Sequence, residues 1–353
     1  ELVPSEYRRF CADVLHLLRA YRNTLARFDG LSKGEGEASD RARTDTIYHA
    51  AEERLLREWR ALWLEGNALV RPLIDKPDAL AAVKAFTEQV LTPEFMGGAI
   101  WNRSYSKPLG YPGDFQMMNY VYQWQSRGAN VYERLVHRIG LDVAECIATR
   151  MVMVQQEIAS VVASGAGSGK PARVLSLGCG PAQEVLNYLE IKSLPRDIDV
   201  TLVDQDHSAL DYADQRVFPQ TMRHGGASRL NCLQVSFIEL MKAGEIFKTL
   251  PPQDLIYTVG LVDYLSIRRI QRLVSSLYRK LAPGGRLVVG NMADVPGSNF
   301  WPMECLCDWN LHYRTEEQML EMAATLPAGS QAEIRPDPTG RVFMLYITKA
   351  VSA

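Results

Sequence analysis

Residues 173–182, which read RVLSLGCGPA, decide the fold of this chain. The apolar run at 173–177 leads directly into a glycine turn, and a helical stretch at 183–190 comes at once after it. Gly178 and Gly180 let the backbone turn sharply and approach a ligand closely, because neither carries a Cβ atom. The helix behind them offers free N–H groups and a partial positive charge. Many tight turns carry a single Gly-x-Gly, so this motif alone does not identify a ligand.

The next apolar run, residues 199–203, ends in Asp204 about one strand–helix–strand unit after the glycines. A carboxylate at the tip of this second strand is placed to hold a ribose through its two hydroxyls. Capping the helix expected at 207–218 is the other role open to Asp204. Together with the glycine turn, Asp204 favours a nucleoside site. Gln183 stands where a dinucleotide fingerprint has its third glycine, which argues against a pyrophosphate.

Four segments resemble the class I S-adenosylmethionine-dependent methyltransferases, in the order and spacing of that family. They are LSLGCGP at 175–181, the acid Asp204 with residues 235–237 after it, QDLIYTVG at 253–260, and LAPGGRLVV at 281–289. Ser176 is a departure, because an acid often stands there. The resemblance implies an α/β, Rossmann-like sheet that is mostly parallel with an antiparallel last strand. It also implies S-adenosylmethionine as the cofactor.

The same resemblance implies a cofactor site along the ends of the strands. The expected cofactor-binding residues are Gly178, Cys179, Gly180, Glu184, Asp204, Gln205, Ser236, Phe237, Val259, Gly260, Asp263 and Tyr264. Of these, Asp263 has a second interpretation, as a cap for the helix expected at 265–281.

Composition limits the remaining possibilities. The chain has 353 residues, a formal net charge of −2 and 47% hydrophobic residues, which suggests two domains with sizeable cores and no electrostatic attraction to nucleic acid. No apolar run reaches the length of a membrane span. The six cysteines are scattered without a Cys-x-x-Cys, which predicts a cytoplasmic protein without a metal site. We expect a small-molecule substrate, whereas the oligomeric state is not indicated.

Periodicity predicts a helical domain at residues 1–163, a Gly/Ser linker at 164–171 and an alternating strand–helix domain at 172–353. We expect the helical domain to act as a lid and to bind the substrate, and the resemblance implies that the second domain binds S-adenosylmethionine. A Pro-Thr-Gly turn between the last two strands, 332–336 and 341–350, predicts a hairpin. The expected helices of the first domain are 7–29, 40–65, 77–91, 114–125, 130–139 and 142–163.

Residues 101–114, WNRSYSKPLGYPGD, form an unusual segment of the helical domain. Two prolines and two glycines disfavour regular structure, and the rest is aromatic or charged. Such a loop favours a binding lid, with Tyr105 and Tyr111 among the expected catalytic residues. A plain connector, with Asp114 capping the next helix, is the alternative.

A second unusual segment lies after the fifth strand. Asn291 stands at the carboxyl end of that strand, where open α/β sheets bind ligands. We expect Asn291 to bond a substrate carboxylate or hydroxyl, and Arg314 to pair with a carboxylate at two points. Tyr313 completes the expected catalytic set. A surface ion pair is the other interpretation of Arg314.

The segments KPLGYPGD, GLVDYL, GN and DWNLHYR extend the resemblance over about residues 95–349. They are similar to a bacterial group that makes hydroxy-fatty-acid methyl esters, a type of quorum signal in secondary metabolism. A related group that cyclises S-adenosylmethionine to azetidine-2-carboxylate is equally similar. Both reactions need aromatic side chains around a sulfonium cation. The candidates are Tyr105, Tyr111, Tyr264, Trp309 and Tyr313.

The sequence therefore predicts a methyltransferase that acts on the carboxylate of a small or fatty hydroxy acid. A carboxylate is already nucleophilic at pH 7, so the transfer needs alignment and no general base. Cyclisation of the cofactor, with release of methylthioadenosine, is the alternative. An inactive cofactor-binding regulator is a further one, which the intact Gly178, Gly180 and Asp204 disfavour.

Overall fold

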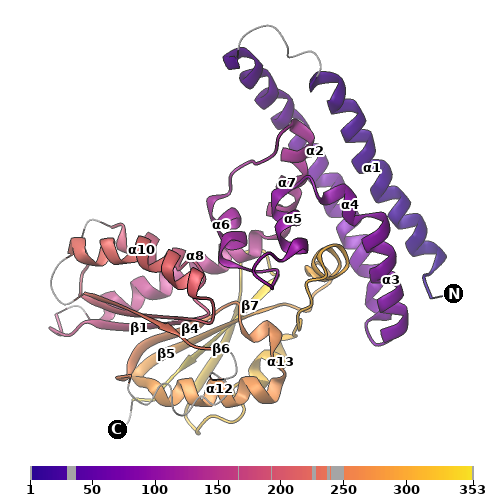
Figure 1. Cartoon of the computed structure of the whole chain (residues 1–353). Coiled ribbons are helices and arrows are strands. Elements are labelled where there is room, and N and C mark those ends of the chain that lie inside the picture. The colour runs from indigo at the N-terminus through magenta and orange to yellow at the C-terminus, as the bar shows by residue number, and fades with distance from the viewer. Residues whose placement is uncertain are drawn as a thin grey trace. The chain divides into compact units, whose positions relative to one another are not determined.

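The computed structural model describes residues 2–29, 37–165, 167–191, 193–224, 228–236, 239 and 250–351, and Figure 1 draws the chain. The chain divides into two compact units. The helical unit comprises Glu1–Glu145 and Pro296–Leu311, and the sheet unit comprises Cys146–Val295 and His312–Ala353.

One seven-stranded sheet with the order β3-β2-β1-β4-β5-β7-β6 forms the centre of the sheet unit. Strands β1 to β5 are parallel, and β7 is antiparallel to both of its neighbours. The predicted Rossmann-like sheet with an antiparallel last strand is confirmed, and β6 forms its edge. The strands are β1 (Ala172–Leu177), β2 (Ile198–Asp204), β3 (Arg229–Gln234), β4 (Gln253–Thr258), β5 (Leu281–Met292), β6 (Gln331–Pro336) and β7 (Val342–Thr348).

Helices cover both faces of this sheet, with α8 and α10 on one face and α12 on the other (Figure 1). Ile270, Leu273, Val274 and Leu277 form the buried stripe of α12, at the spacing of one helix face. They share a core cluster with the apolar side chains of β1, β4 and β5. The helices are α8 (Glu145–Ser164), α9 (Gln183–Leu189), α10 (His207–His224), η2 (Val262–Tyr264), α12 (Ile267–Lys280) and α13 (Glu316–Glu321).

The helical unit is held together by aromatic side chains. Trp59 and Trp301 are fully buried, and Trp301 donates its indole N–H to the hydroxyl of Tyr7 at 2.9 Å. Residues Trp301–Cys305 form a π-helix, η3. π-Helices are rare in proteins, and many of those that occur lie at functional sites. The other helices are α1 (Ser5–Asp29), α2 (Glu37–Val70), η1 (Arg71–Leu73), α3 (Pro77–Val90), α4 (Thr92–Phe95), α5 (Ala99–Ser106), α6 (Phe115–Gln123) and α7 (Val131–Val143).

The compact units differ from the predicted domain limits in two places. Helix α8 precedes the predicted linker but belongs to the sheet unit, where Glu157 pairs with Arg286 and Thr149 donates to Asp337 at 2.6 Å. Residues 296–311 belong to the helical unit, because the carbonyl of Ser298 accepts hydrogen bonds from α2. These long-range contacts have no local signal in the sequence.

The expectation that segment 101–114 lacks regular structure is wrong for its first half. Helix α5 covers residues up to Ser106 because Ile100 and Trp101 are buried, and tertiary packing outweighs the nearby prolines. Lys107 ends α5 in the left-handed conformation. Asp114 caps α6 by accepting from the N–H of Met117 at 2.8 Å, as the connector alternative predicted.

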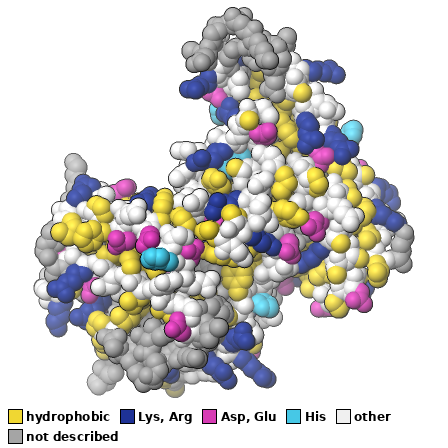
Figure 2. Space-filling view, viewed as in Figure 1, with side chains coloured by type: hydrophobic (Ala, Val, Ile, Leu, Met, Phe, Trp, Pro, Cys, Tyr) yellow, Lys and Arg dark blue, Asp and Glu magenta, His cyan; other side chains and the backbone are white. Residues whose placement is uncertain are grey.

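Acidic side chains are interspersed with basic ones over the face shown in Figure 2, in keeping with the net charge of −2. None of the described helices combines the length and the apolar composition needed to cross a membrane.

Candidate cofactor site and helical pocket

The glycine turn after β1 provides an open cradle. Gly178 has φ 70° and Gly180 has φ 51°, a left-handed region that favours glycine. A Cβ on Gly180 would meet nothing within 4 Å, and one on Gly178 would meet only the Cβ of Leu261, at 3.7 Å. Cys179 between them is buried, which raises the pKa of its thiol well above the usual value. The turn therefore leaves space for a ligand beside exposed backbone.

Asp204 ends β2 beside this turn. Its Oδ2 accepts the N–H of Gly180 at 2.9 Å, and its Oδ1 accepts the N–H of Asp206 at 3.0 Å. Burial raises the pKa of this carboxyl, and these backbone donors oppose the shift. Each carboxylate oxygen can accept a further hydrogen bond, so two ribose hydroxyls can still be held there.

A buried acid and a buried phenol join the helix after the glycine turn to β4. The hydroxyl of Tyr257 donates to Oε1 of Glu184 at 2.7 Å. Burial is the main cause that raises the pKa of both groups. Glu184 was expected in the site, whereas Tyr257 was not, since its sequence position shows only a β-strand residue.

Asp263 ties the loop after β4 to the end of β5. Its Oδ1 accepts the N–H of Met292 at 2.7 Å, and its carbonyl accepts the N–H of His312 at 2.8 Å. The alternative of a helix cap is wrong, because Ser266 occupies the cap position of α12. Asp263 is buried, and burial raises the pKa of its carboxyl.

The structure brings Asn291 and Arg314 together, but it bonds them to each other and to the backbone. Asn291 donates to the carbonyls of Met292 and His312, both at 2.8 Å, and its Oδ1 accepts from Nη1 of Arg314. Arg314 also donates to the carbonyls of Val262, which begins η2, and Leu265, which follows it. Both side chains are buried, so the surface ion pair is wrong for Arg314. Direct substrate contact by either residue stays a prediction.

The other expected residues of the sheet unit lie at its surface. Gln205, Ser236, Gly260 and Tyr264 are exposed, and Val259 and Tyr313 are half-buried. Ser236 donates its hydroxyl to Glu239 at 2.6 Å. Phe237, expected beside the adenine, lies outside the described residues.

Sequence reasoning missed Arg150 on α8. It is buried, and its Nη2 lies 3.2 Å from the point where a Cβ on Gly260 would stand. Its charge lowers the pKa values of Glu184 and Asp263, against the effect of their burial. The signal was available, because Arg150 falls in the apolar stripe of α8 with Ile147 and Val154.

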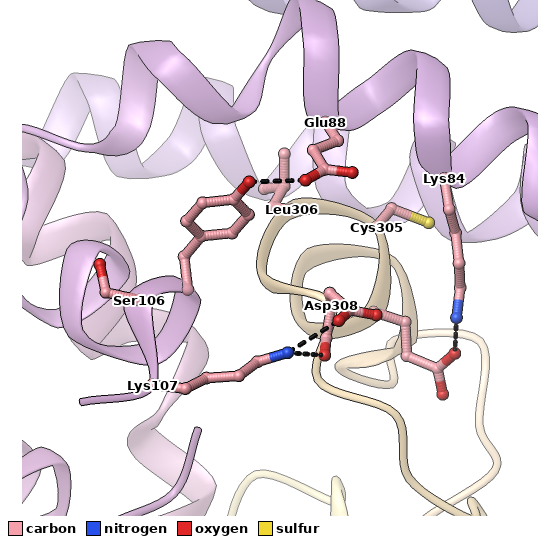
Figure 3. Close-up of a pocket in the computed structure, with 9 residues that line it drawn as sticks. Lys84, Glu88, Ser106, Lys107, Cys305, Leu306 and Asp308 are labelled. Carbon is pink, nitrogen blue, oxygen red and sulfur yellow. Dashed lines mark hydrogen bonds and ion pairs between the residues drawn. The ribbon is translucent and has the colours of Figure 1, made fainter. Parts of the chain in front are cut away.

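The helical unit contains a cavity of about 390 Å³, drawn in Figure 3. Lys84 from α3 donates to Glu304 at 2.6 Å, and Lys107 donates to the carboxylate of Asp308 at 2.7 Å. The expected residue Tyr105 also lines it. The sequence does not indicate that Lys84 and Glu304 pair, because they lie 220 positions apart.

Tyr105 and the turn after it are fixed within the helical unit. The hydroxyl of Tyr105 donates to Glu88 at 2.5 Å, a bond that raises the pKa of this phenol. A Cβ on Gly113 would lie only 2.6 Å from the ring of Trp309, so the turn that contains the half-buried Tyr111 approaches this buried indole closely. Among the described residues, no cluster of His, Cys, Asp and Glu forms a metal site.

The fold matches solved structures with low sequence identity. A possible exported protein from Bordetella parapertussis is 17% identical with a TM-score of 0.54, covering 76% of this chain and 96% of its own. The magnesium protoporphyrin IX methyltransferase of Synechocystis PCC 6803, with bound S-adenosylhomocysteine, is 12% identical with a TM-score of 0.46, covering 70% and 97%. No match was found among the curated proteins.

The sequence model of one family matches residues 109–291, which is more than half of the chain, and the family is described as "Putative methyltransferase". The open glycine cradle and the acid that ends β2 fit the nucleoside of S-adenosylmethionine. The chain belongs to this family of S-adenosylmethionine-dependent methyltransferases.

Proposed function

We propose that the protein transfers a methyl group to a carboxylate oxygen of a small or fatty hydroxy acid. The bound cofactor would supply a methyl group attached to a cationic sulfur. The carboxylate acceptor is ionised at pH 7 and needs no general base, so the chain has to bind and align it. Gly178, Gly180 and Asp204 would hold the nucleoside.

The pocket of the helical unit is the observation that supports a carboxylate acceptor. Lys84 bonds Glu304 and Asn310, and Lys107 bonds two oxygens of Asp308. An ammonium group has three N–H donors, so each lysine has one donor left for a ligand oxygen. Figure 3 shows both lysines beside the same cavity.

The remaining walls of this pocket suit a hydroxy acid. Tyr105 and Glu88 offer a phenol and a carboxylate to a hydroxyl group, while Cys305 and Leu306 supply apolar surface. We propose that the helical unit binds the acceptor. The lid role predicted for segment 101–114 then becomes a role in acceptor binding through Tyr105 and Lys107.

Product analysis tests this function. We expect S-adenosylhomocysteine and a methyl ester to form in equal amounts, only when a hydroxy acid is added, as measured by mass spectrometry. Release of methylthioadenosine from cofactor and protein alone would establish the cyclisation to azetidine-2-carboxylate instead. Cofactor binding without either product, across short and long hydroxy acids, would establish a regulator.

A matched pair of variants tests the pocket. Lys84→Met should raise the KM for the acceptor about tenfold and leave S-adenosylhomocysteine binding unchanged, because one charge-assisted hydrogen bond is lost. Lys76→Met, at an exposed position just before α3, is the control and should change neither value. An unchanged KM in Lys84→Met would remove the pocket from the proposal.

A further inference from the structure

Arg150 occupies a position where a charged side chain is costly. It lies on the buried face of α8, between Ile147 and Val154, and only 6% of its surface is exposed. A guanidinium stays charged at every physiological pH, so it cannot reduce the cost of burial by losing a proton. A buried charge of this kind requires a compensating partner.

That partner is missing from the described part of the chain. The Nε of Arg150 is buried without a hydrogen-bond partner, and its guanidinium forms no ion pair with a described residue. Glu184 and Asp263 attract the charge of Arg150, but neither carboxylate is hydrogen-bonded to it: Tyr257 bonds Glu184, and the N–H of Met292 bonds Asp263. A buried cation with open donors indicates a site for an anionic ligand.

The position of Arg150 identifies which anion fits. The crossing from β1 to β4 is the point where the strand order reverses, and open α/β sheets bind ligands there. Asp204 ends β2 on one side of β1, and Nη2 of Arg150 lies beside Gly260, just after β4, on the other side. A nucleoside held at Asp204 would therefore direct its substituent across the glycine turn toward Arg150.

We propose that Arg150 binds the α-carboxylate at the methionine end of S-adenosylmethionine. Glu184 then faces the α-ammonium group, so buried charges of both signs match a zwitterion. In this arrangement Glu184 supplies the negative charge that an acid at position 176 often supplies, where this chain has Ser176. The inference rests on the cofactor and does not depend on which acceptor is methylated.

Ligands that lack the carboxylate distinguish carboxylate binding by Arg150 from a purely structural role of this residue. Titration calorimetry should compare S-adenosylhomocysteine with decarboxylated S-adenosylhomocysteine and with methylthioadenosine, which lacks the amino-acid end. Arg150→Met should weaken S-adenosylhomocysteine about 100-fold, because a two-point bond to a carboxylate is lost. The affinities for the two fragments should stay within about twofold of the wild type.

Two further variants make the result decisive. Arg150→Lys keeps the charge but loses the two-point geometry, and should recover part of the S-adenosylhomocysteine affinity. Arg286→Met, which removes an arginine that pairs with the same helix α8 at Glu157, should leave all three affinities unchanged. Equal weakening of all three ligands by Arg150→Met would show a structural role and overturn the proposal. Unchanged S-adenosylhomocysteine affinity would overturn it too, whereas the loss of methyl-ester formation alone would concern only the acceptor.

Discussion

Two buried arginines of the sheet unit are placed in opposite surroundings. Arg314, in the segment after β5, donates to Asn291 and to the carbonyls of Val262 and Leu265. Arg150, on α8, makes no hydrogen bond through its Nε and no ion pair with a described residue. The hydrogen bonds of Arg314 are supplied by the protein itself, whereas the Nε of Arg150 has a donor that a ligand can satisfy. Burial alone therefore does not identify a binding residue, whereas a buried donor without a partner is a feature that a ligand could explain.

The largest expected effect is the loss of stability when Arg314 is removed. Arg314→Met leaves Asn291 Oδ1 and two carbonyls without their donor in a buried place, at about 1–3 kcal/mol for each such group. We expect the free energy of unfolding to fall by about 4 kcal/mol and the melting temperature by about 10 °C. Urea titration followed by circular dichroism measures the first value, and calorimetry the second.

This result also decides between two roles for Arg314. If Arg314→Met keeps the stability of the wild type and raises only the KM for the acceptor, the sequence-based prediction of a substrate contact is correct. Arg335→Met, at a half-exposed position on β6, is the control for loss of an arginine and should cost no more than about 1 kcal/mol.

These arginines also show how much the sequence could predict. The glycine turn and Asp204 were found because their signal is local, a strand followed by a turn at a fixed spacing. Asn291 and Arg314 were placed at the correct end of the sheet. Their partners were not predicted, because the carbonyls of Val262 and Leu265 lie about 50 positions before Arg314 and carry no side-chain signal. The same limit applies to Lys84 and Glu304 in the helical pocket.

His137 is a buried base that, unlike an arginine, can lose its charge. Burial lowers the pKa of its imidazole from 6.5 to about 4, and its Nδ1 accepts the N–H of Ile100 at 3.2 Å. The unfolded chain therefore binds more protons between pH 6.5 and 4, so stability should fall as the pH decreases through this window. The pKa shift corresponds to a loss of about 3 kcal/mol in the free energy of unfolding, and this loss is complete below about pH 4.

His137→Asn tests this pH dependence, because its amide oxygen can replace Nδ1 as the acceptor. The difference in unfolding free energy between about pH 7.5 and about pH 4.5, measured by urea titration, should be smaller in the variant than in the wild type. Equal pH dependence in both proteins would show that His137 is not the group that titrates.

A smaller effect is expected at the ribose end of the site. Asp204→Asn keeps one acceptor oxygen but loses the charge and one backbone partner. The affinity for S-adenosylhomocysteine and for methylthioadenosine should fall about tenfold, since both ligands contain the ribose, a loss of about 1.4 kcal/mol. Calorimetric titration checks both values. An effect on S-adenosylhomocysteine alone would place Asp204 at the methionine end instead.

The smallest expected effect completes the comparison of the two arginines. Arg150→Met in the protein without cofactor removes a buried charge whose donors lack partners, and it puts an apolar side chain of similar length into the stripe of Ile147 and Val154. Replacing a poorly compensated buried charge by a well-packed apolar residue is often neutral or stabilising. We therefore expect a change of less than about 1 kcal/mol in the unfolding free energy, in contrast to the large loss for Arg314→Met. Added S-adenosylhomocysteine should raise the melting temperature of the wild type more than that of Arg150→Met, because stabilisation by a ligand increases with its affinity. A large loss of stability in the cofactor-free variant would give Arg150 the same structural role as Arg314.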